Sequence, residues 1–165
     1  RIGLEDPGFR NVLDLVAALG LEVVPVASDN SGILPTALEA ALEAGIAALI
    51  VTPRAQSPMG AALDADRTRA LRRVLRARPD LLVVEDDHAG AVAGAGVQTL
   101  WERGRERWAV VRSTSKTHGP DLRLAALVGD RETMARVAGR QRIDVARVFQ
   151  RTDAPPDVGC SATGL

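Results

Sequence analysis

Short continuous apolar runs alternate along the chain with longer stretches in which apolar residues recur at helical spacing. This spacing predicts helices over residues 11–19, 35–44, 64–77 and 131–149. The apolar runs predict strands over residues 2–4, 21–26, 46–51, 81–84, 108–111 and 122–128. Residues 89–96 are small and rich in glycine and predict a loop, whereas residues 151–165 lack periodicity and predict a flexible tail.

Strands that are apolar throughout, separated by amphipathic helices, are typical of a largely parallel sheet that is covered on both faces. We therefore predict an α/β fold, a three-layer α/β/α domain over residues 1–150, with a mostly parallel sheet of about five to seven strands. Such sheets bind ligands beyond the carboxyl ends of their strands. Polar clusters follow three of the predicted strands, at residues 52–60, 85–88 and 113–123.

The composition fits one globular domain without an excess of either charge. The 165 residues include 21 Lys+Arg and 21 Asp+Glu, which argues against a free-standing nucleic-acid binder. The arginines crowded into residues 64–77 are expected to form a solvated helix face. The single cysteine, Cys160, cannot form an internal disulfide, and no apolar run is long enough to span a bilayer. We therefore expect a cytoplasmic protein with no membrane partner.

One lysine, Lys116, stands among 20 arginines. Arginine replaces lysine where only a positive charge is needed, but not where a deprotonated amine is needed, because its pKa stays above about 12. Lys116 is therefore a candidate for chemistry, and the alternative is a solvated surface lysine left by chance.

The surroundings of Lys116 favour the chemical interpretation. Hydroxyl side chains flank it, a Gly-Pro turn follows, and Arg123 lies seven residues beyond it. A lysine amine can condense with a carbonyl group, and an arginine with hydroxyls can hold a phosphate, so the segment suits a phosphorylated aldehyde. Asp86 ends a buried strand, where a carboxylate needs a cationic partner, and a protonated pyridine nitrogen is one such partner.

Four segments resemble the fold-type I, pyridoxal-phosphate-dependent aminotransferases of class I/II. The resemblance is strongest to the aminotransferase-like domain of MocR-type GntR-family transcriptional regulators. It extends over roughly residues 1–145, in the order of the family. The matching segments are residues 5–9 (Glu-Asp-Pro-Gly-Phe), 52–60, 85–88 (Glu-Asp-Asp-His) and 113–124.

The resemblance implies a role for each matching residue. Lys116 is the catalytic lysine that forms a Schiff base with pyridoxal 5′-phosphate, and Asp86, or alternatively its neighbour Asp87, pairs with the pyridinium nitrogen. His88 and Ser57 correspond to residues that contact the phenolic oxygen. The implied phosphate ligands are Ser113, Ser115 and Arg123, and no metal site is implied.

Departures from the family pattern favour cofactor binding over efficient transamination. His88 replaces a tyrosine, and Ser57 and Met59 replace the asparagine and threonine of an Asn-Pro-Thr-Gly pattern. The phosphate loop upstream of residues 5–9, the arginine of a smaller C-terminal domain and a DNA-binding helix-turn-helix have no counterpart here. The chain also begins at Arg1, so we expect a fragment of a larger protein.

Three functional hypotheses follow from the resemblance. The first is the effector-sensing part of a MocR-type regulator, which takes an amino acid or amine ligand and reaches DNA only through an upstream domain. The second is an aminotransferase that moves an amino group between an amino acid and a 2-oxo acid. The third is a truncated, inactive remnant. Family resemblance also implies a homodimer.

Overall fold

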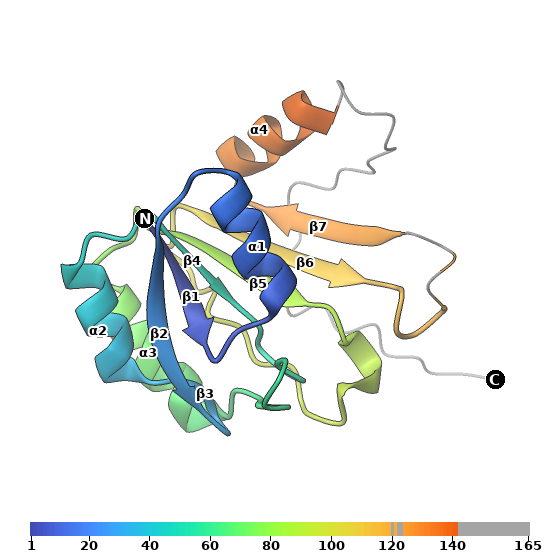
Figure 1. Cartoon of the computed structure of the whole chain (residues 1–165), viewed down its shortest axis with the longest axis horizontal. Coiled ribbons are helices and arrows are strands. Elements are labelled where there is room, and N and C mark those ends of the chain that lie inside the picture. The colour runs from blue at the N-terminus through green and yellow to red at the C-terminus, as the bar shows by residue number, and fades with distance from the viewer. Residues whose placement is uncertain (120, 122–123, 142–165) are drawn as a thin grey trace.

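The computed structural model describes residues 1–119, 121 and 124–141, which fold into one sheet with helices around it (Figure 1). The strands are β1 (Ile2–Asp6), β2 (Val23–Asp29), β3 (Gly32–Ile33), β4 (Ala48–Val51), β5 (Leu82–Asp87), β6 (Trp108–Ser113) and β7 (Ala125–Gly129). The helices are α1 (Arg10–Ala18), α2 (Pro35–Glu43), α3 (Ala65–Leu75), α4 (Arg131–Gln141) and a short 3-10 helix, η1 (Gly90–Ala93).

The seven strands lie in the order β3-β2-β1-β4-β5-β6-β7. The five neighbouring strands β2, β1, β4, β5 and β6 pair in parallel, and β7 runs antiparallel to β6. The hairpin of β2 with β3 was not predicted, because a two-residue strand is too short to show any periodicity. The α/β prediction is confirmed, with a sheet of mixed direction.

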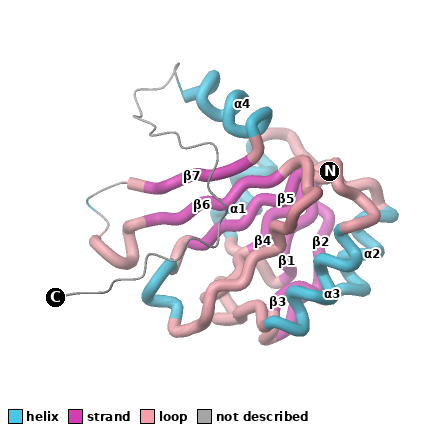
Figure 2. Tube along the Cα trace, turned by 180° about the vertical axis from the view of Figure 1, so that it is seen from behind, coloured by secondary structure: helices cyan, strands magenta, loops and turns pink. Residues whose placement is uncertain are grey.

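The helices cover the two faces of the sheet. In Figure 1, α1 crosses in front of the central strands, and from behind, in Figure 2, α3 lies on the near side with α2 beside it. The main apolar core fills the space between α2, α3 and the sheet. Its fully buried members include Val26, Ile33, Leu38, Ile46, Leu49, Val51, Leu71, Leu75, Leu81 and Val83.

Local chemistry sets the helix limits close to the predicted ones. Pro35 opens α2 at its first turn, where a missing N–H does no harm. Asp64 caps α3 by accepting a hydrogen bond from the Arg67 N–H at 2.7 Å. Gly20 and Gly45 follow α1 and α2 with φ values of 68° and 78°, which suit glycine. No helix in the described part of the chain is long and apolar enough to cross a membrane.

Several predicted strands, β5 among them, end two or three residues later in the structure. The strand predicted to end at residue 84 continues to Asp87, because the buried carboxyl groups of Glu85 and Asp87 find hydrogen-bond partners. The predicted loop at 89–96 contains the 3-10 turn η1. The helix predicted over 131–149 is described as far as Gln141, and its remainder and the predicted tail at 151–165 lie outside the described residues.

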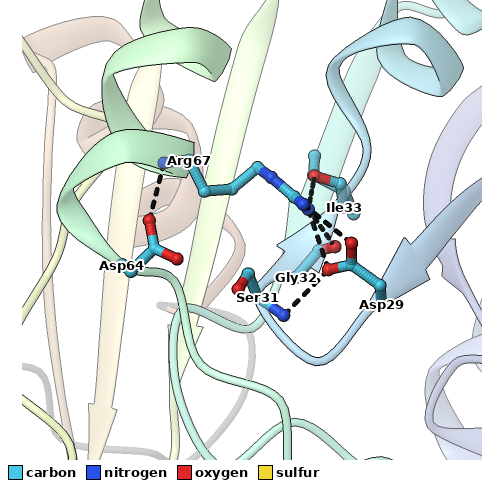
Figure 3. Close-up of polar contacts among 6 residues, drawn as sticks. All are labelled: Asp29, Ser31, Gly32, Ile33, Asp64 and Arg67. Atoms are coloured by element: carbon cyan, nitrogen blue, oxygen red, sulfur yellow. Dashed lines mark hydrogen bonds and ion pairs between the residues drawn. The ribbon is translucent and has the colours of Figure 1, made fainter.

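Arg67 is not part of a solvated face, contrary to the expectation for this arginine-rich helix. Its guanidinium forms a two-pronged ion pair with Asp29, at 3.0 and 2.7 Å, across the turn that joins β2 to β3 (Figure 3). It also donates to the carbonyl oxygens of Gly32 at 2.8 Å and Ile33 at 2.9 Å. The hydrogen bonds of Arg67 therefore link α3 to the β2–β3 hairpin and stabilise their contact.

We expect Arg67→Ala to lower the free energy of unfolding by about 1.5–3 kcal/mol, because several charge-assisted hydrogen bonds are lost together. Urea unfolding of the purified chain measures this change. Arg69→Ala is the matched control, since within the described residues Arg69 forms an exposed ion pair with Asp66 of the same helix. Its effect should stay within about 0.5 kcal/mol. Equal losses in both variants would contradict a special role for Arg67.

Candidate functional site

A cavity of about 360 Å³ lies beyond the carboxyl ends of the central strands. This volume is within the range of about 300–1,000 Å³ that is usual for small-ligand sites. Apolar side chains from β1, β4 and α1 form one part of its wall, and polar residues from β1, from β5 and from the loops after β4, β5 and β6 form the other. The lining residues are Leu4, Glu5, Gly8, Phe9, Val12, Leu13, Ile50, Thr52, Ser57, Asp86, His88 and Lys116.

The parallel register brings these residues together. Leu4 of β1 lies opposite Ile50 of β4, and Asp86 of β5 lies opposite Val111 of β6. Strands that run in the same direction end at the same edge, so the segments that follow β1, β4, β5 and β6 meet there. The three polar clusters seen in the sequence each supply at least one residue to the cavity.

Consecutive acidic residues of β5 have different partners. Asp87 is 2% exposed and accepts two hydrogen bonds from Arg54, at 2.7 and 2.8 Å. Arg112 forms a second ion pair with Asp87 at 3.1 Å. Asp86 instead lines the cavity. Of the two carboxylates considered as a cofactor partner, only Asp86 therefore reaches the place where a ligand would lie.

These environments move the two pKa values in opposite directions. Burial raises the pKa of the Asp86 carboxyl, a nearby His88 opposes this effect, and the Asp87 charge adds to it. Burial alone would also raise the pKa of Asp87. The hydrogen bond and charge of Arg54, with the charge of Arg112, outweigh burial and hold that pKa below its ordinary value.

Glu85, on the same strand, has a structural role. Its carboxylate accepts from the Thr99 hydroxyl at 2.8 Å and from the N–H groups of Leu100 at 2.7 Å and Trp101 at 3.1 Å. Burial raises its pKa in spite of these bonds. Glu85 therefore anchors the segment 99–101 and does not belong to the cavity.

The loop after β4 is held in place by Gln56. Its side chain donates to the Pro7 carbonyl at 2.7 Å and accepts from the Met59 N–H at 3.2 Å. Ala55 has a left-handed φ of 52°, which a non-glycine residue keeps only when its surroundings impose it. This arrangement positions Ser57 on the cavity wall.

Lys116 lies in a tight turn after β6. The N–H of His118 donates to the Thr114 carbonyl at 2.8 Å, which closes the turn around Lys116. The hydroxyls of Ser113 and Ser115 are 2.8 Å apart, and the Ser115 N–H donates to Ser113 Oγ at 3.2 Å. Lys116 reaches the cavity, whereas the described lining does not include the two serines.

Of the sequence-predicted site residues, the cavity therefore unites Lys116, Asp86, His88 and Ser57. Ser113 and Ser115 lie beside each other at the end of β6, and their role as phosphate ligands stays a prediction. Arg123 lies outside the described residues.

Sequence reasoning gave no separate role to Glu5, Thr52 and Phe9, which also line the cavity. Glu5 is 7% exposed although it is acidic and follows an apolar run. A charged residue at the carboxyl end of a predicted parallel strand was the available signal.

Comparison with known proteins gives a consistent result. Residues 1–151 match the family model for aminotransferase class I and II. The chain is 39% identical over 136 residues to the vitamin B6 salvage pathway transcriptional repressor PtsJ of Salmonella typhimurium, across 82% of this chain and 32% of that protein. It is 42% identical over 87 residues to the HTH-type pyridoxine biosynthesis transcriptional regulator PdxR of Corynebacterium glutamicum, across 53% of this chain and 18% of that protein.

Among solved structures, the chain is similar to the aminotransferase Aro8 from Candida albicans, with a TM-score of 0.75 and 22% identity. The match covers 87% of this chain and 36% of that one. At this identity the likeness concerns the fold alone. The chain thus spans about a third of the length of PtsJ and of Aro8, and less of PdxR.

We expect Asp87→Asn to lower the free energy of unfolding by about 3 kcal/mol at neutral pH, because Arg54 is left buried without its countercharge. Urea unfolding measures the change. The control is Asp80→Asn, which breaks the exposed ion pair with Arg78 and should cost at most about 1 kcal/mol.

The stability of the wild type and of Asp87→Asn, compared as a function of pH, gives a second test. The folded pKa of Asp87 lies below its unfolded value of about 3.9, so its stabilising effect is complete above that value and is lost as pH falls through the folded pKa. The difference between wild type and Asp87→Asn should therefore shrink below about pH 4. A constant difference down to acid unfolding would contradict the ion pair as its cause.

Proposed function

This chain belongs to the aminotransferase class I and II family, and from that premise we propose that it binds pyridoxal 5′-phosphate as the ligand-sensing part of a transcriptional regulator. The family resemblance seen in the sequence is thereby confirmed. The observation that carries the proposal is the cavity in which Lys116, the chain's one lysine, lies with Asp86, His88 and Ser57. Contact with DNA through a domain beyond this chain, and a homodimeric assembly, belong to the same proposal.

The chemistry of the cavity fits this cofactor. A primary amine suits its aldehyde, a carboxylate suits a protonated ring nitrogen, and an imidazole with a hydroxyl suits a phenolate oxygen. The apolar wall of Leu4, Ile50 and Val12 suits the faces of an aromatic ring. When bound, pyridoxal phosphate supplies an electrophilic carbon and a ring that accepts electrons.

Each of the predicted site residues has a role in this arrangement. Asp86, whose own pKa is raised by burial, gains a countercharge from a cationic ring nitrogen and holds a proton on that atom. His88 and Ser57 orient the ring through hydrogen bonds to its phenolate. Lys116 Nζ would bind the electrophilic carbon of the cofactor and would move a proton at that carbon. Ser113, Ser115 and Arg123 hold the phosphate.

Sensing is favoured over turnover by two observations. The relatives PtsJ and PdxR are regulators of vitamin B6 salvage and of pyridoxine biosynthesis, which favours a B6 vitamer as the signal. His88 and Ser57 replace the tyrosine and asparagine of the catalytic pattern, so the phenolate is held by different groups. The second candidate, an aminotransferase, is supported by the fold of Aro8.

Borohydride trapping tests the cofactor site. We expect the wild-type chain to develop a visible absorption band with pyridoxal phosphate, and reduction followed by peptide mapping to find the cofactor on the Lys116 peptide. Lys116→Ala should lose the band. Lys116→Arg keeps the charge without a reactive amine and is the matched control. Attachment only to the amino terminus of Arg1, or an unchanged band in either variant, would refute the proposed role.

Turnover separates the two candidates. With cofactor bound, the regulator proposal expects amines to shift the absorption band without net transfer of an amino group to an added 2-oxo acid. Chromatography of the product amino acids measures transfer. Sustained, Lys116-dependent turnover would overturn sensing in favour of the enzyme.

A further inference from the structure

Glu5 is a buried carboxyl group at the cavity to which the proposed function gives no task. It is 7% exposed, and its Oε1 atom has no hydrogen-bond partner among the described residues. A buried carboxylate oxygen without a partner is costly, so such a group either carries a proton or gains stability from a positive partner.

Glu5, Thr52 and Asp86 lie at or just after the carboxyl ends of three neighbouring strands, β1, β4 and β5. Leu4 pairs with Ile50, so Glu5 is level with Val51, the last residue of β4 and the one before Thr52. Val51 in turn pairs with Glu85, the residue before Asp86. Glu5, Thr52 and Asp86 all line the cavity, and the charge of Asp86 acts on Glu5.

The surroundings of Glu5 hold a proton on its carboxyl group up to about neutral pH in the absence of a ligand. Burial is the main cause that raises the pKa of Glu5 to about 7, and the charge of Asp86 adds to it. Hydrogen bonds with Thr52 and Gln56 act in the opposite direction and lower this pKa. The other titratable groups on the cavity are His88, which follows β5, and Lys116. Neighbouring positions from α1 are apolar, and Arg54 of the loop after β4 is bound to Asp87.

We propose that Glu5 is a positioning residue of the cofactor site, which gives up its proton when a cationic pyridine ring binds beside Asp86. This inference rests on the proposed function. A ring cation neutralises Asp86, which removes the repulsion between the two carboxyl groups and attracts the Glu5 carboxylate. Binding and proton release are thereby linked, and the two negative groups together hold the ring in its protonated form.

The linkage has a definite sign. At pH values below the pKa that Glu5 has with the cofactor bound, its carboxyl group is protonated both with and without the cofactor. Its ionisation then has no effect on affinity. As pH rises toward the free-state value of about 7, the bound state loses its proton first, so affinity increases. If binding lowers the pKa by one unit, the gain in affinity is about tenfold.

Affinity for pyridoxal phosphate, followed by quenching of tryptophan fluorescence between about pH 5.5 and 8, tests the inference. The ratio of wild-type to Glu5→Gln affinity is expected to rise about tenfold across this range, because glutamine mimics the protonated carboxyl and cannot ionise. Titration of the cofactor's own groups is common to both proteins and cancels in the ratio. Glu22→Gln removes an exposed carboxylate that pairs with Arg1, and it should follow the wild type.

The outcomes are distinct. Parallel pH profiles for wild type and Glu5→Gln, with cofactor still trapped on Lys116, would overturn the role of Glu5 and leave the proposed function standing. Failure of every variant, wild type included, to bind the cofactor would overturn both.

A second measurement does not need the variant to fold. In the wild-type chain labelled with ¹³C-glutamate, the Glu5 carboxyl resonance is expected to titrate near pH 7 alone. Its midpoint should move about one unit lower when pyridoxal phosphate is added. A midpoint that stays in place, or moves upward, would contradict the proposed coupling.

Discussion

Parallel pairing of β1, β4, β5 and β6 brings four carboxyl ends to one edge of the sheet, and the cavity is the result. Apolar strands can be buried on both faces only if their polar residues gather at the ends. Residues more than 100 positions apart in the sequence, such as Glu5 and Lys116, therefore line the same space. A shift of β5 by one residue against its neighbours would turn Asp86 away from it.

Much of this arrangement could be predicted from the sequence. Apolar periodicity predicted the helices and the central strands, and the family motifs predicted four cavity residues, of which Lys116 is the clearest. Isolation of one lysine among 20 arginines is a chemical signal that needs no structure. The roles of these residues toward a cofactor stay predictions.

Other features could not be predicted, for physical reasons. The resemblance named Asp86 ahead of Asp87, but the physical reason, the alternation of side chains in β5, lay beyond the predicted strand, which ended at residue 84. The ion pair of Arg54 with Asp87 joins residues 33 positions apart. Arg67 looks like its neighbours in sequence, and only the fold shows that Asp29 lies within its reach.

The contact of Arg67 with β3 also affects whether copies of the protein can associate through the edges of their sheets. β3 stands at one border of the described sheet, where free backbone groups can recruit a strand from another chain. The carbonyl oxygens of both residues of β3 already accept hydrogen bonds from one guanidinium. A side chain thus occupies acceptors that an intruding strand would need, which disfavours the addition of a strand from another copy at this border.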